Sequence, residues 1–205
     1  MKPARAAATA LAALVLSALA AGPTWAGEPT AQLRARIDRV LQILDNEDMP
    51  RDERRVAVRA IVTEIFDVKE ISKRALGHHW QDRTPVEQRE FTQLFGDLLE
   101  RACFSRLDLY GGHRVLYLGD SIDGDLASVR TKIVSRDETG IDVHYRMMLR
   151  GDQWVGYDVS ITGLSLVASY RQQFNRIIQT SSYGELVKQL RARQDEQQPR
   201  QTSQK

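Results

Sequence analysis

The chain has 205 residues, a formal charge of +2 and a single cysteine. The near balance of acidic and basic residues argues against a nucleic-acid-binding protein, which needs a basic surface for the phosphate backbone. Because Cys103 stands alone, no intrachain disulfide can form, and the fold must depend on its hydrophobic core. The length predicts one domain that is large enough to bury such a core.

The first 26 residues have the order of a cleaved secretory signal. Lys2 and Arg5 form a basic start, residues 6–21 are almost entirely Ala, Leu and Val, and small residues stand at Thr24 and Ala26. The apolar run is shorter than the roughly 20 residues that a membrane-spanning helix needs. We therefore expect cleavage near Ala26 and export of the remaining chain. Cleavage removes two cations from 29 Lys and Arg, which leaves them equal in number to the 27 Asp and Glu.

Apolar residues at helical spacing predict four helices in the first half of the chain. They are expected at 33–46, 56–65, 67–77 and 84–110. Two of them begin with the pattern of a capping box, in which Asp67 faces Glu70 and Thr84 faces Glu87. These pairs predict the start of each helix to the residue.

The pattern then changes to alternating apolar and polar residues. Four strands are predicted at 113–119, 127–135, 141–150 and 154–161. Turn signals lie between them, of which Asp123-Gly124 and Gly151-Asp152 are examples. Short turns and alternation predict an antiparallel meander with one apolar face, so the fold class is α+β.

Two further helices close the predicted domain. Ser165 is expected to cap the first, and Ser182 with Glu185 forms a capping box at the start of the second. From residue 193 onward the sequence is rich in Gln, Arg, Lys and Ser, a composition typical of disorder. The predicted organisation is a signal peptide at 1–26, a single domain at 27–192 and a disordered polar tail at 193–205.

The residues predict no catalytic site and no metal site. His78 and His79 are adjacent, so their side chains diverge on a regular element and suit a shared metal poorly. Ser165 lies in half of a nucleophile-elbow pattern but is interpreted as a helix cap. Asp158 lies inside the fourth strand; we expect a structural ion pair, with Arg171 as a candidate partner, and keep a catalytic acid as the alternative.

Motifs from Phe66 onward resemble the MlaC family of periplasmic phospholipid-binding proteins, which are also labelled toluene-tolerance proteins. A hopanoid-associated branch, HpnM, is similar in pattern. The matching segments are Phe66-Asp67, Leu76-Gly77-x-x-Trp80, Thr84-Pro85-x-x-Gln88, Tyr157-Asp158-Val159 and Gly163-x-Ser165-Leu166-Val167-x-x-Tyr170-Arg171-x-x-Phe174.

The resemblance implies a soluble monomeric carrier in the periplasm that helps to maintain the lipid asymmetry of the outer membrane. Such a carrier takes phospholipid between an outer-membrane lipoprotein and porin complex and an inner-membrane ABC transporter with an MCE-domain subunit. It has no cofactor apart from the lipid cargo, and it binds no nucleic acid. The acyl chains of the lipid are expected in a pocket between a curved sheet and the helices.

No motif of the family marks individual lipid contacts, so we assign them to one apolar face of the predicted sheet and to two helical residues. The predicted contacts are Val129, Ile133, Val143, Tyr145, Met147, Val155, Tyr157 and Val159 on the sheet, with Leu98 and Phe174 on the helices. Three alternatives stay open at this point: a carrier of hopanoid or another lipid, a cup-shaped α+β enzyme that uses Asp158 or a histidine, and a binding protein for a small polar solute.

Overall fold

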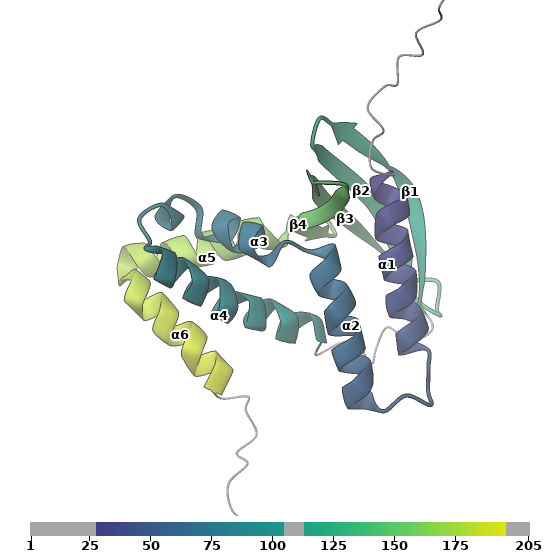
Figure 1. Cartoon of the computed structure of the whole chain (residues 1–205), viewed down its shortest axis with the longest axis horizontal. Helices are drawn as coiled ribbons and strands as arrows, with labels where there is room; N and C mark the ends of the chain where they lie inside the picture. The colour runs from purple at the N-terminus through teal and green to yellow at the C-terminus, as the bar shows by residue number, and fades with distance from the viewer. Residues whose placement is uncertain (1–27, 105–112, 196–205) are drawn as a thin grey trace, which may run out of the picture.

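A computed structural model describes residues 28–104 and 113–195 (Figure 1). The helices in these ranges are α1 (Pro29–Leu44), α2 (Arg51–Ile65), α3 (Val68–Leu76), a 3₁₀ turn η1 (Gly77–Trp80), α4 (Pro85–Phe104), α5 (Leu166–Thr180) and α6 (Tyr183–Asp195). The predicted signal peptide, the end of the fourth predicted helix and residues 196–205 of the predicted tail lie outside the described residues. The first three residues of that tail, 193–195, were predicted to be disordered but form the end of α6. None of the described helices combines the length and hydropathy of a membrane-spanning segment.

The sheet is an antiparallel meander, which confirms the predicted α+β class. Its strands are β1 (Arg114–Asp123), β2 (Leu126–Val134), β3 (Gly140–Arg150), β4 (Gln153–Ile161) and β5 (Leu164–Ser165), in the order β1-β2-β3-β4-β5. The four predicted strands are present, and β5 adds a two-residue fifth. β1 continues four residues past its predicted end at Gly119, because a register shift after Tyr117 lets it follow β2 to the turn.

Side-chain caps start α3 and α5 at the predicted residues, whereas α1 and α2 begin without a side-chain cap, at Pro29 and Arg51, ahead of their predicted starts. The Asp67 carboxylate accepts a hydrogen bond from the Glu70 N–H at 2.9 Å and begins α3. The Ser165 hydroxyl accepts one from the Ala168 N–H at 3.0 Å and begins α5. Each cap satisfies a backbone donor that the helix itself leaves without a partner.

The start of α4 is fixed from both directions. The Thr84 N–H donates to the Glu87 carboxylate at 2.7 Å, and the Glu87 N–H donates to the Thr84 hydroxyl at 3.3 Å. The bond from the Thr84 backbone also holds the pKa of Glu87 below its usual value. This predicted capping box sets where α4 begins and therefore which of its residues face the rest of the domain.

The domain contains two separate groups of buried apolar residues. The helical core lies among α3 to α6 and consists of Ile71, Ala75, Leu76, Trp80, Phe91, Leu94, Phe95, Val167, Phe174, Leu186, Val187 and Leu190. The sheet core lies between α1, α2 and the sheet and consists of Leu33, Ile61, Ile65, Ala127, Val129, Met147 and Trp154. In Figure 1, α1 lies along the sheet, α3 to α6 form a second group, and α2 runs between them.

Candidate functional site

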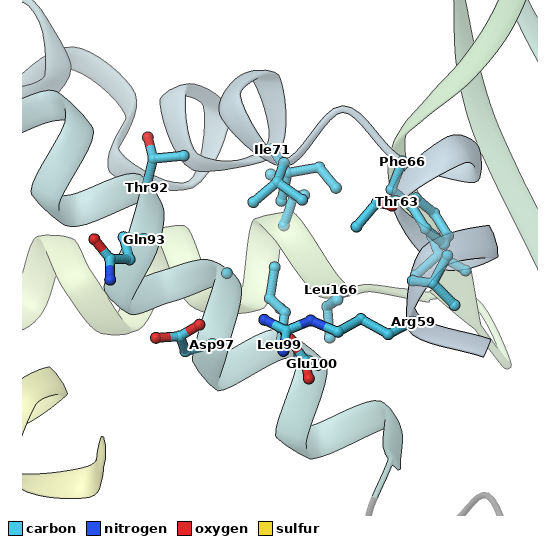
Figure 2. A pocket seen from close by; sticks show the side chains of 15 residues that line it. Arg59, Thr63, Phe66, Ile71, Thr92, Gln93, Asp97, Leu99, Glu100 and Leu166 are labelled. Carbon is cyan, nitrogen blue, oxygen red and sulfur yellow. The ribbon is translucent and has the colours of Figure 1, made fainter. Parts of the chain in front are cut away.

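An apolar cavity of about 330 Å³ lies where the two cores meet (Figure 2). Its walls come from α2, α3, α4, β4 and the start of α5. The lining residues are Arg59, Val62, Thr63, Phe66, Val68, Ile71, Thr92, Gln93, Gly96, Asp97, Leu99, Glu100, Val159, Leu166 and Val167. The volume is at the lower end of the range of about 300–1,000 Å³ that ligand pockets occupy.

Phe66 joins the two walls, because it packs partly against both cores. It follows the last residue of α2 and forms an isolated parallel bridge with Gly156 of β4, beside which the Asp67 N–H donates to the Gly156 carbonyl at 3.0 Å. A Cβ atom at Gly156 would stand 2.8 Å from the Phe66 ring. Only glycine lets the ring lie this close to β4, so Gly156 positions a wall of the cavity.

The helix α2 presents different residues to the sheet and to the cavity. Ile61 and Ile65 are buried on the side of α2 that packs into the sheet core. Val62 stands on an adjacent stripe and lines the cavity. One face of α2 therefore packs into the sheet core, and the neighbouring face lines the cavity.

Helices α3 and α4 approach each other closely at the opposite wall. A Cβ atom at Gly96 would lie 3.0 Å from a methyl group of Val68, so glycine allows the close approach there. Ile71 of α3 and Val167 of α5 are buried at this wall and belong to the helical core as well. The far side of the cavity is therefore the surface of a packed core.

Polar and charged residues of α2 and α4 stand around the apolar walls. Arg59 of α2 reaches toward α4, where its Nη2 atom lies 2.8 Å from Oε2 of Glu100 (Figure 2). The Arg59 side chain is 57% exposed and the Glu100 side chain is 28% exposed. The Asp97 carboxylate accepts a hydrogen bond from the Gln194 amide of α6 at 2.7 Å. The cavity thus has apolar walls and a charged edge.

The ten predicted lipid contacts all lie within the described residues, and they fall into different parts of the structure. Val159 lines the cavity. Val129 and Met147 are buried in the sheet core, and Tyr145 packs against that core with its ring 6.3 Å from the Phe66 ring. Phe174 is part of the helical core, and Leu98 packs against it.

The remaining four predicted contacts lie elsewhere on the sheet. Val143 is buried on β3, and Ile133 is half-buried on β2, where it pairs with Ile141. Val155 is half-buried on β4. The Arg74 guanidinium of α3 lies over the ring of Tyr157, with its Cζ atom 4.0 Å from the ring centroid. The structure therefore brings Val159 to the cavity with residues that were not predicted, among them Val62, Phe66, Leu99 and Leu166.

Two sequence signals pointed at this wall. Phe66 occupies the position before the Asp67 cap, and Leu166 and Val167 follow the Ser165 cap. Both signals predict helix starts, and in both cases apolar residues stand directly beside the capping residue. Neither signal says that the neighbouring space is open.

Asp158 has a different partner from the one expected. The residue is 3% exposed. Its carboxylate accepts hydrogen bonds from the Ser165 hydroxyl at 2.6 Å and from the Val167 N–H at 3.1 Å, and it lies 3.9 Å from the Arg146 guanidinium. Arg171 was the wrong partner: it donates instead to the Arg74 carbonyl at 2.8 Å. Asp158 therefore stabilises the start of α5, because the positive end of the helix dipole interacts favourably with a negative charge there. Among the described residues, no three His, Cys, Asp or Glu side chains are grouped to hold a metal ion.

The structure is an α+β fold in which helices and one strand of the meander sheet line an apolar cavity. The chain belongs to the MlaC family: the sequence profile described as MlaC protein matches residues 34–192. The fold is similar to that of the phospholipid-binding protein from Ralstonia solanacearum, which was solved in complex with a phospholipid. The similarity has a TM-score of 0.73 and 25% sequence identity, and it covers 83% of this chain and 98% of the Ralstonia chain.

Proposed function

We propose that this protein binds the acyl chains of a phospholipid in the cavity between its two cores and carries the lipid between membranes. The character of the cavity is the observation that carries the proposal. Charged residues stand at its edge, while its walls are formed by eight apolar residues: Val62, Phe66, Val68, Ile71, Leu99, Val159, Leu166 and Val167. This arrangement suits a molecule with an apolar body and a charged end.

A carrier of this kind solves a definite energetic problem. Exposing a methylene group to water costs about 0.8 kcal/mol, so two acyl chains of about 16 carbons cost on the order of 25 kcal/mol. A dry cavity removes most of this cost. It must not bind the lipid much more tightly than a bilayer does, because the lipid would then not be released. The direction of transport is therefore set by partner complexes.

Some of the predicted sheet contacts form the second part of the proposed lipid site. Val159 contacts the chain directly, and a chain that extends past Phe66 reaches Tyr145 on the same face of the sheet, while Met147 and Val129 support that face from within the sheet core. Leu98 and Phe174 support the opposite wall from the helical core. The cavity volume of about 330 Å³ favours such an extension when both chains are bound.

The family and the phospholipid bound to the Ralstonia protein support this cargo. Within the proposal the protein acts as a monomer in the periplasm after removal of residues 1–26. It exchanges lipid with an outer-membrane lipoprotein and porin complex and with an inner-membrane ABC transporter that has an MCE-domain subunit. It catalyses no reaction and needs no cofactor.

Two valine variants on the same helix test the cavity assignment. Val62 lines the cavity, whereas Val56 is 68% exposed and lies outside it. A carboxylate at position 62 must be desolvated against an acyl chain, so Val62→Asp lowers the affinity for phospholipid by at least about tenfold. Val56→Asp meets water and leaves the affinity unchanged.

Native mass spectrometry of freshly purified protein provides the measurement. The proposal predicts bound phospholipid in the unsubstituted protein and in Val56→Asp, and its loss from folded Val62→Asp. Circular dichroism checks the fold of each variant. An empty unsubstituted protein would contradict lipid carriage, a bound terpenoid would point to the hopanoid-associated branch, and equal occupancy in both variants would place the lipid elsewhere.

A further inference from the structure

The charged edge of the cavity has a definite arrangement of sign. Asp97 and Glu100 are three residues apart on α4, which places both carboxylates on one face of the helix. Arg59 approaches from α2 on the other side of the cavity (Figure 2). Among the described residues that line the cavity, Arg59 is the cation and these two are the anions. The edge therefore presents one positive group and two negative groups.

These groups keep bonding capacity beyond their present partners. Glu100 is paired with Arg59 at 2.8 Å, and Asp97 accepts from Gln194 at 2.7 Å. A carboxylate has about four acceptor positions, and a guanidinium has five N–H donors, so each group can bind a further partner. The Arg59 side chain is 57% exposed, so a ligand at the edge can reach it.

We propose that this edge selects a zwitterionic phospholipid headgroup with a primary ammonium over an anionic headgroup. The inference rests on the proposed function, because it requires acyl chains in the cavity. Arg59 binds the lipid phosphate, as a guanidinium suits phosphate oxygens. Asp97 and Glu100 accept hydrogen bonds from the ammonium group.

An anionic headgroup lacks this complementarity. Phosphatidylglycerol brings the same phosphate, but it places uncharged hydroxyl groups beside two carboxylates. The ammonium of phosphatidylethanolamine compensates one of the two negative charges, whereas the glycerol headgroup compensates none. Phosphatidylcholine has the positive charge but no N–H donor, so its expected affinity is intermediate.

A competition experiment measures this selectivity. Purified protein without lipid is mixed with vesicles that contain equimolar phosphatidylethanolamine and phosphatidylglycerol with identical acyl chains. The protein is then separated from the vesicles, and both the headgroup ratio and the total lipid per protein are measured by mass spectrometry. We expect an excess of phosphatidylethanolamine of up to about fivefold, which is the range given by partly exposed charge pairs.

The double variant Asp97→Asn and Glu100→Gln removes both charges and keeps the side-chain shapes. It is expected to lose the preference, so that the headgroup ratio of the bound lipid falls to that of the vesicles. Glu90→Gln is the matched control, because Glu90 also lies on α4, is paired with an arginine of another helix, Arg191, and does not line the cavity. It is expected to keep the preference of the unsubstituted protein.

The two measured quantities separate the two proposals. Equal uptake of both lipids by the unsubstituted protein overturns the headgroup inference without any variant, and so does a preference that the double variant keeps. If the double variant fails to fold, the single variants Asp97→Asn and Glu100→Gln must each reduce the preference, and two unchanged ratios overturn the inference. An absence of any bound lipid in the unsubstituted protein overturns the proposed function itself.

Discussion

The helical core and the sheet core are built from different side chains. The helical core is rich in aromatic residues, with the Phe95 ring 4.9 Å from the Tyr170 ring and 5.1 Å from the Phe174 ring. The sheet core is mainly aliphatic apart from Trp154. Each core is closed by its own elements, and Phe66 packs against both. Because neither core depends on filling the space between them, a cavity can persist there without an unpacked interior.

The largest expected effect tests whether the two cores are independent. Phe95→Ala removes a fully buried ring from the helical core and lowers the free energy of unfolding by about 3–5 kcal/mol. Met147→Ala removes a fully buried side chain from the sheet core and lowers the free energy of unfolding by about 2–5 kcal/mol. Since the two residues belong to separate cores, the double variant should match the sum to within about 0.5 kcal/mol in urea unfolding. A larger deviation would mean that the cores act as one.

The next effect tests the junction between them. Gly156→Ala places a methyl group 2.8 Å from the Phe66 ring and should cost about 1–3 kcal/mol through overpacking. Combining it with Phe66→Ala removes the clash. The double variant should therefore be more stable than the sum of the single effects by at least about 0.5 kcal/mol in thermal or urea unfolding. Strictly additive effects would show that Gly156 does not position Phe66.

A smaller effect is expected at the cap that follows the junction. Asp67→Ala removes the acceptor for the Glu70 N–H and should lower the free energy of unfolding by about 0.5–2 kcal/mol. Asp67→Ser keeps an acceptor and should restore most of this loss. If the serine and alanine variants unfold at the same urea concentration, the cap is not what stabilises the start of α3.

The smallest effect is expected at the ion pair that spans the two regions. Arg59→Gln breaks the contact with Glu100, but both side chains are partly exposed, so the free energy of unfolding should fall by less than about 1 kcal/mol. Arg39→Gln, which breaks the exposed pair with Glu64 away from the cavity, is the control. Both should unfold alike, while Arg59→Gln alone should weaken phospholipid binding. Equal binding by both variants would remove Arg59 from the proposed site.

Local structure could be predicted from the sequence because its causes act over a few residues. The caps at Asp67, Thr84 and Ser165 each require one acceptor and one N–H three residues away. The strands could be predicted from the alternation of apolar and polar residues, and the short turns between them predicted that consecutive strands pair in a meander. The extra length of β1 was missed because the shift after Tyr117 depends on pairing with β2.

The cavity could not be predicted, because alternation identifies a face of a sheet but not what covers it. Val129 and Val159 both belong to the apolar pattern, yet Val129 is buried in the sheet core and Val159 lines the cavity. The difference comes from where α2 ends and Phe66 crosses β4, which is a tertiary contact. The partner of Asp158 was missed for a related reason: the turn through β5 brings the start of α5 to its carboxylate.

In the proposed lipid complex, a phospholipid chain lies between the helical core and the sheet core. A crystal structure of the protein loaded with a phospholipid that has a dibrominated acyl chain tests it most directly, because anomalous scattering locates the bromine atoms. Bromine peaks are expected in the cavity, beside Val62, Val159 and Leu166. Bromine peaks confined to the outer face of the sheet or to the far side of the helical core would contradict it.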